Sequence, residues 1–115
     1  MVTHRGYIPE RGDAVRIAWN HKGGRNSQGL CVALVLSPAA YNEKVGFALF
    51  CPISDRAKGY PFEVSIPEGM KVVGVVLSDE LKSLDWRALK VELICRLPET
   101  TVLEVLRKSA TLLSK

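Results

Sequence analysis

Short apolar runs of strand length, each bounded by glycine, proline or polar turn residues, recur along most of this 115-residue chain. The runs that we predict as strands cover residues 13–19, 30–36, 46–53, 62–66, 72–77 and 90–95. Runs of this length and composition are typical of β-strands, and several of them at such short spacing indicate a barrel or a curled sheet. We therefore expect a mainly β fold, built as one domain over residues 1–115.

The apolar pattern changes its period near the C-terminus. Pro98 and the acidic and hydroxyl residues that follow it are typical of a helix start. The stripe that we predict for this helix contains Val102, Leu103, Leu106, Ser109, Ala110, Leu112 and Leu113. Lys115 would end the helix with the charge that its dipole favours. The sequence thus predicts one amphipathic C-terminal helix, packed on the sheet or at a dimer interface.

The composition is that of a globular protein. Hydrophobic residues make up 47% of the chain and charged residues 24%, which excludes a disordered protein. No apolar run approaches the roughly 18–20 residues that span a bilayer, and the first residues lack the apolar core of a signal peptide. We therefore expect a cytoplasmic protein with no membrane segment.

The three cysteines, Cys31, Cys51 and Cys95, lie far apart in the sequence and in apolar surroundings. None has CxxC spacing or a neighbouring histidine, so we expect reduced thiols, no metal site and no cofactor. Nothing near Cys31 in the sequence would lower its thiol pKa, which argues against a cysteine nucleophile.

Two loops concentrate basic residues. Segment 19–28 contains His21, Lys22 and Arg25 but no acid, and the loop after Ile53 contains Arg56 and Lys58. The formal net charge of +4 is by itself only a mild indication of polyanion binding. Extending from one small barrel, however, the two loops would form a surface suited to phosphates. The alternative is that they are ordinary solvated loops.

Segment 52–62 contains Ser54 at the end of a predicted buried strand and then the second basic loop. The point where a strand passes into a loop is a common location for site residues. Further short sequences accompany this segment in a fixed order: Gly12-Asp13, Ala-Leu-Val-Leu-Ser-Pro at 33–38, Tyr41-Asn42, and Leu-Lys-Ser-Leu-Asp-Trp-Arg at 81–87. As a set, from about residue 7 to the C-terminus, they resemble the MazF/PemK family of toxins, which are ribosome-independent endoribonucleases.

This resemblance implies an SH3-like (CcdB-like) twisted β-barrel with a C-terminal helix, assembled as a homodimer whose surface carries an RNA groove. It also implies metal-free cleavage of single-stranded messenger or ribosomal RNA. The ribose 2′-hydroxyl would attack the adjacent phosphorus, giving 2′,3′-cyclic phosphate and 5′-hydroxyl ends, and this chemistry needs a base, an acid and positive charge. The implied partner is a cognate antitoxin whose acid-rich tail covers the same groove.

Two positions decide which residues could carry that chemistry. Ser54 lies where the family has threonine or serine, but Cys31 lies at the position of the family's phosphate-stabilising arginine. A thiol cannot present a guanidinium to a phosphate. We therefore expect a nearby cation to supply the charge and a loop histidine to act as base or acid. The predicted catalytic residues are Ser54, Arg25 and His21, and the predicted RNA-binding residues are Lys22, Asn26, Arg56 and Lys58.

Two other functions stay open at this point. Because Cys31 replaces the family arginine, the chain could be a weakened relative that binds RNA or antitoxin without turnover. The same barrel also occurs in CcdB-like toxins that bind DNA gyrase, and fold alone does not choose between such functions.

Overall fold

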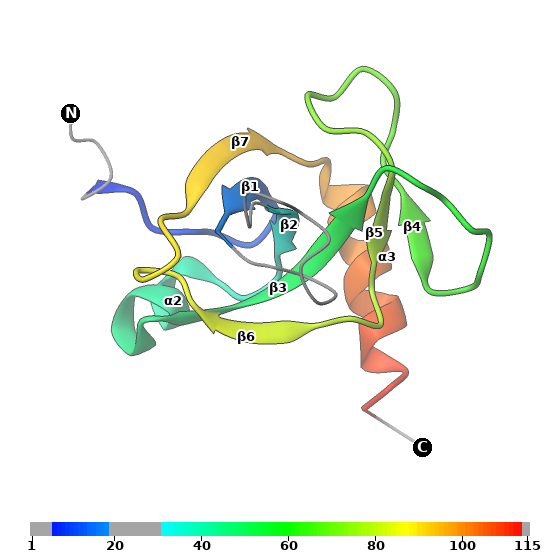
Figure 1. Ribbon diagram of the computed structural model, residues 1–115. Helices are drawn as coiled ribbons and strands as arrows, with labels where there is room; N and C mark the ends of the chain where they lie inside the picture. Colours follow the sequence, from blue (N-terminus) through cyan, green and yellow to red (C-terminus); the bar gives the residue numbers. More distant parts are fainter. Residues whose placement is uncertain (1–5, 19–30, 114–115) are drawn as a thin grey trace.

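The structure, a computed structural model, describes residues 6–18 and 31–113. Its elements are β1 (Asp13–Ile17), β2 (Cys31–Val35), α2 (Ala39–Val45), β3 (Phe47–Ser54), β4 (Glu63–Ser65), β5 (Val75–Leu77), β6 (Lys82–Asp85), β7 (Glu92–Arg96) and α3 (Glu99–Ala110). Figure 1 shows them as one strongly curled sheet with α2 and α3 at its two ends. The predicted mainly β fold with a C-terminal helix is confirmed.

The strands form an antiparallel sheet in the order β4-β5-β3-β2-β1-β7. The long strand β3 joins the part of the sheet formed by β4 and β5 to the part formed by β2, β1 and β7. The first half of β3 pairs with β6 from Phe47 to Phe50, its middle pairs with β2, and its last residues, Ile53 and Ser54, pair with β5. The end of β3 therefore lies where the sheet turns from one layer to the next.

Every predicted strand is present in the described part of the chain, with bounds shifted inward by one to three residues in most cases. Two elements were not predicted. Strand β6 is short and mostly exposed, so it lacks an apolar pattern. Helix α2 has seven residues, of which only Asn42 is buried, and it is bounded by Pro38 and by Gly46 in a left-handed conformation. Its proline and glycine were readable signals, but we placed Gly46 in the following strand.

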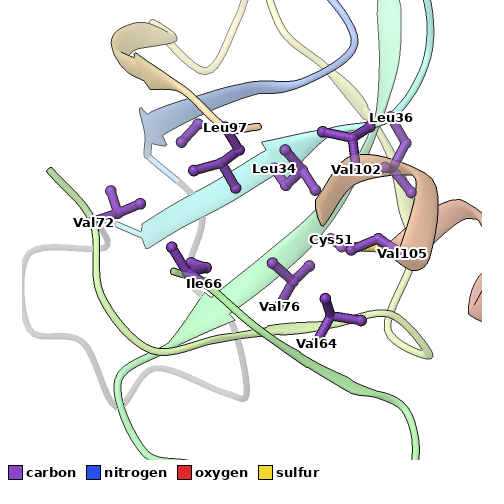
Figure 2. Packing of buried hydrophobic residues seen from close by; sticks show 11 residues of the cluster. Leu34, Leu36, Cys51, Val64, Ile66, Val72, Val76, Leu97, Val102 and Val105 are labelled. Carbon is purple, nitrogen blue, oxygen red and sulfur yellow. The ribbon is translucent and has the colours of Figure 1, made fainter. Parts of the chain in front are cut away.

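The sheet separates two apolar clusters, because successive strand residues point to opposite faces. On one face Ala14, Leu34 and Cys51 pack against helix α3, and Figure 2 shows Val102 and Val105 of that helix among these side chains. The other face holds a second cluster of Val15, Ile17, Ala33, Val35, Ala48, Phe50, Trp86 and Val91. Val15 and Ile17 thus lie on the face opposite to Ala14, as the alternation of apolar residues along this strand indicates.

The stripe predicted for the C-terminal helix was partly wrong. The buried residues of α3 are Thr101, Val102, Val105 and Ser109, whereas Leu103, Leu112 and Leu113 are 54%, 51% and 82% exposed. Small hydroxyl residues occupy the tight contact with the sheet: Ser109 donates a hydrogen bond of 2.7 Å to the carbonyl of Ser78. The helix ends at Ala110, and Lys115 lies outside the described residues.

The motifs Tyr41-Asn42 and Trp86-Arg87 connect helix α2 to the segments around it on the side of the second cluster. Asn42 is fully buried and donates to the carbonyls of Pro9 (2.7 Å) and Ser37 (3.0 Å), while its side-chain oxygen accepts from the Ser37 hydroxyl at 2.6 Å. The indole of Trp86 donates to the Asn42 carbonyl at 2.9 Å, and the Arg87 guanidinium lies 4.7 Å from the Trp86 ring centre. Trp86 is therefore a scaffold residue.

No helix among residues 6–18 and 31–113 is long and apolar enough to cross a membrane.

Candidate functional site

An open cleft of about 880 Å³ lies where β1, β2 and β7 meet the end of β3. The loops on either side of β4, which extend away from the sheet (Figure 1), form its other wall. Val32, Ile53 and Ile94 give it an apolar floor, and its charged and hydroxyl side chains come from both walls. These are Arg16, Ser54, Asp55, Arg56, Lys58, Tyr60, Glu63, Lys71 and Glu80. A chain in this cleft would meet a rigid sheet on one side and loops on the other.

Ser54 is the last residue of β3 and is held on two sides. Its backbone pairs with Val75 of β5, and its carbonyl comes so close to Gly74 that a Cβ there would lie 2.0 Å away. Its hydroxyl accepts from the Arg56 amide at 3.1 Å and donates to the Arg56 carbonyl at 3.3 Å. The Ser54 hydroxyl thus stabilises the turn that starts the basic loop and lies at the cleft wall.

The basic loop 55–62 is fastened by side chains from outside it. The Glu63 carboxylate accepts from the Lys58 amide at 2.8 Å and from the Gly59 amide at 2.9 Å. From α3, the Lys108 ammonium donates to the Pro61 carbonyl at 2.6 Å and to the Glu63 carbonyl at 3.1 Å. Because these bonds hold the backbone, the loop presents Arg56 and Lys58 to the cleft from a fixed base.

The charges that line the cleft favour an anion. The cations are Arg16, Arg56, Lys58 and Lys71, and the acids are Asp55, Glu63 and Glu80. Both Glu63 oxygens already accept from backbone amides. Among the described residues that line this cleft, four cations therefore face three acids, and one of these acids, Glu63, has both oxygens engaged by the backbone.

Cys31 lines the same cleft and is half-buried. Burial raises the pKa of its thiol to about 11, and burial likewise raises that of Cys51 to about 12. The Cys31 side chain is consequently neutral at physiological pH, and it can supply neither a cation nor a reactive thiolate. The three cysteines carry free thiols, as predicted, although only Cys51 is fully buried.

The structure brings together four of the residues singled out from the sequence: Ser54, Arg56, Lys58 and Cys31 all line the cleft. The other predicted site residues, His21, Lys22, Arg25 and Asn26, lie outside the described residues. Within residues 6–18 and 31–113, no group of three or more histidine, cysteine or carboxylate side chains is placed to hold a metal ion.

Two cleft residues, Arg16 and Lys71, were missed. A signal existed for Arg16, which is the only charged residue between Asp13 and Ile17 and shares one strand face with Ala14. A lone arginine on one face of an otherwise apolar strand indicates that this part of the face borders solvent or a polar site. Lys71 had no comparable signal, since it is one polar residue in a turn.

The curled antiparallel sheet, its C-terminal helix and the basic cleft at the end of β3 define a small β protein with an open anion-accepting site. The chain belongs to the family described as PemK-like, MazF-like toxins of type II toxin-antitoxin systems, whose family model matches residues 10–113. The family predicted from the short motifs is thereby confirmed.

Individual relatives agree with this membership. The chain is 42% identical over 82 residues to the endoribonuclease toxin MazF of Escherichia coli K12, a match that covers 71% of this chain and 73% of that protein. It is 29% identical over 109 residues to the Escherichia coli endoribonuclease PemK, covering 91% of this chain and 82% of that protein.

Solved structures agree as well. MazF from Deinococcus radiodurans is 44% identical and superposes with a TM-score of 0.84 over 93% of this chain and 97% of its own. A MazE–MazF crystal structure from the same organism contains a chain that is 43% identical and matches with a TM-score of 0.83, covering 93% and 96% of the two chains.

Proposed function

We propose that this protein is an endoribonuclease toxin that cleaves single-stranded RNA in the cleft at the end of β3. The observation that carries the proposal is the gathering of Arg16, Arg56, Lys58 and Lys71 around the Ser54 hydroxyl in one open cleft. Single-stranded nucleic acids bind in positively charged grooves that follow the phosphates. Family membership and the endoribonuclease names of the relatives support the same reaction.

The reaction that we propose is metal-free attack by the ribose 2′-hydroxyl on the adjacent phosphorus. It leaves a 2′,3′-cyclic phosphate on one product and a 5′-hydroxyl on the other. The Ser54 hydroxyl exchanges its 3.3 Å hydrogen bond to the Arg56 carbonyl for one to a phosphate oxygen, and cleft cations offset the charge that develops on the phosphate oxygens. We propose His21 as the base or acid and Arg25 as a further cation, with Lys22 and Asn26 binding the strand.

Incubation of the purified protein with long single-stranded RNA in EDTA tests this proposal. We expect cleavage, with 5′-hydroxyl and 2′,3′-cyclic phosphate ends found by end-mapping. Ser54→Ala and Arg25→Ala should each slow cleavage at least about tenfold, because each removes a donor to the phosphate. Ser65→Ala, an exposed serine on the neighbouring strand β4, is the matched control. Intact RNA at large enzyme excess would refute the proposed activity, and unchanged rates in both variants would refute the residue roles.

The neutral Cys31 thiol favours a second candidate function, which is binding without efficient turnover. A missing oxyanion donor costs on the order of 100–1000-fold in rate, and the Cys31 side chain brings no charge to the cleft. Tight RNA binding with no cut ends, measured on the same preparation, would identify this function. The named relatives are endoribonucleases, so we do not propose the gyrase-binding alternative.

We further propose that the toxin is a cytoplasmic homodimer neutralised by a cognate antitoxin. The MazE–MazF structure of Deinococcus radiodurans supports an antitoxin partner, and an acid-rich tail is chemically suited to the same basic cleft. Light scattering of the purified protein measures its mass in solution. Co-expression with the adjacent gene product, followed by affinity purification, tests the partner, and full RNA cleavage by the co-purified complex would contradict neutralisation.

A further inference from the structure

We infer that Arg16 is the fixed phosphate-binding cation of the cleft. This inference deepens the proposed function and rests on it for the identity of the polyanion, a single-stranded nucleic acid. It differs from the sequence-based expectation, in which the charge comes from a loop.

Arg16 comes from the most rigid wall of the cleft. It lies on β1, which pairs with β2 on one side and β7 on the other, and its direct partners are Val32 and Glu92. Arg56, Lys58 and Lys71 come from loops instead. Binding groups on strands are held more precisely than those on loops, so Arg16 is the described cleft cation whose position is best defined before a ligand arrives.

The position of Arg16 next to the start of β2 adds to this argument. Arg16 lies across from Val32, and the next residue along β1, Ile17, lies across from Cys31. Arg16, Val32 and Cys31 all line the cleft. Arg16 and Val32 thus share the face of the sheet that lines the cleft, whereas the Cys31 side chain packs with Ile17 against the second cluster.

The contact that Arg16 makes with Glu92 is easily exchanged. Its Nη1 atom lies 3.4 Å from Glu92 Oε1, and the two side chains are 48% and 53% exposed. Ion pairs between exposed side chains are weak. A phosphate offers the guanidinium two acceptor oxygens in the geometry that its fork prefers. Arg16 can therefore leave Glu92 for a phosphate at little cost.

The test measures binding of a short single strand with 2′-deoxy sugars, which cannot be cut through a 2′-hydroxyl. Affinity is measured over a range of salt concentrations for the wild type and for Arg16→Gln, Arg16→Lys and Arg107→Gln. Arg107, an exposed arginine on α3 paired with Glu104, is the matched control. We expect Arg16→Gln to weaken binding about tenfold and to reduce the slope of log K against log salt by about 0.7, the value for one phosphate contact on a single strand.

The other variants distinguish the effect of the Arg16 charge from the effect of its hydrogen-bonding geometry and from any effect on folding. Arg16→Lys keeps the positive charge and should therefore restore the wild-type slope. Any remaining loss of affinity relative to the wild type measures the contribution of the two-pronged hydrogen bonding of the guanidinium. Glu92→Gln should bind the strand at least as tightly as the wild type, because it removes the competing carboxylate. Thermal unfolding of each variant confirms the fold. Wild-type affinity and slope in Arg16→Gln would overturn the inference.

Cleavage of RNA by the same proteins distinguishes the two proposals. If the wild type cuts RNA and Arg16→Gln cuts it at the same kcat/KM, the endoribonuclease proposal survives and the role of Arg16 fails. If the wild type leaves RNA intact but binding depends on Arg16 as expected, the role of Arg16 survives and the proposed activity fails.

Discussion

At the scale of single residues, a neutral side chain at the start of β2 leaves the charge of the site to other segments of the chain. Cys31 borders the cleft and packs against the second cluster, and its thiol stays protonated because burial raises its pKa to about 11. The surrounding cations, Arg16, Arg56, Lys58 and Lys71, come from three other segments of the chain. The positive charge of this cleft is thus spread over its walls rather than concentrated at the start of β2.

Introducing a guanidinium at that position should increase RNA cleavage. We expect Cys31→Arg to raise kcat/KM on single-stranded RNA at least about tenfold, since one preorganised donor at a developing oxyanion is worth on the order of 100–1000-fold. Initial rates with a defined RNA measure the effect. Cys31→Met, which adds bulk without charge, is the control and should not increase the rate. A rate unchanged by Cys31→Arg would mean that other residues already supply the charge that the reaction needs.

At the scale of elements, the site depends on how the loop between β3 and β4 is fastened. Glu63 holds the loop by accepting from the Lys58 and Gly59 amides. Glu63→Gln leaves one acceptor and turns an NH₂ group toward the second amide, so we expect faster hydrogen exchange at Lys58 and Gly59. The free energy of unfolding should change by less than about 1.5 kcal/mol.

Glu63→Gln should also change the rate of RNA cleavage. Because the loosened loop carries Arg56 and Lys58, RNA cleavage by Glu63→Gln should fall several-fold, chiefly through a higher KM. Glu68→Gln, an exposed acid in the next loop, is the control for the loss of one charge. Unchanged exchange rates at both amides would show that Glu63 does not hold the loop.

The junction of β3 and β5 depends on Gly74. Its φ is +116° and a Cβ would lie 2.0 Å from the Ser54 carbonyl oxygen, so Gly74→Ala combines backbone strain with a steric overlap. We expect a loss of about 3–5 kcal/mol in the free energy of unfolding, measured by urea denaturation. Gly69→Ala is the control, because its φ is +92° with nothing within 4 Å. It should lose only about 1–2 kcal/mol, and an equal loss in both variants would contradict the overlap.

The sequence predicted the elements well wherever apolar residues alternate or recur. Strand β1 is an example, since Val15 and Ile17 lie on one face and Ala14 on the other, as expected. It failed where tertiary contacts decide: β6 forms by pairing with β3, and α3 buries Thr101 and Ser109 because small hydroxyl side chains fit against the sheet. Of the site, the pattern gave Ser54 and its loop. The lone arginine at position 16 was a signal that we missed, but its place in the cleft depends on strands distant in sequence.

At the scale of the whole molecule, the two clusters on either side of the sheet make the protein sensitive to alkaline pH. Burial raises the pKa of Cys51 to about 12 and that of Cys31 to about 11, and burial and the hydrogen bond to Asp13 also raise the pKa of Tyr7. A thiol in the unfolded chain ionises near pH 8.5. The unfolded state therefore loses these protons first, and the stability that the neutral thiols contribute is lost as pH rises from about 8.5 toward 12.

We expect the thiols to leave the free energy of unfolding nearly constant from pH 7 to 8.5. Above pH 8.5 the free energy of unfolding should fall. Each thiol contributes a slope of up to about 1.4 kcal/mol per pH unit. Urea denaturation between pH 7 and 10.5 measures this slope. Cys51→Ala should be less stable at pH 7 but show a shallower decline. Val76→Ala, buried in the same cluster, should lose stability equally at each pH. A decline as steep in Cys51→Ala as in the wild type would exclude Cys51 as a source.

The order of the strands also sets when during synthesis the molecule can act. β1 lies between β2 and β7, so β1 keeps an unpaired edge until β7, which begins only at Glu92 much further along the chain, has been synthesised. Ile94 of β7 completes the floor of the cleft, and Glu92 lies beside Arg16. The cleft therefore stays incomplete until β7 has been synthesised and has paired with β1.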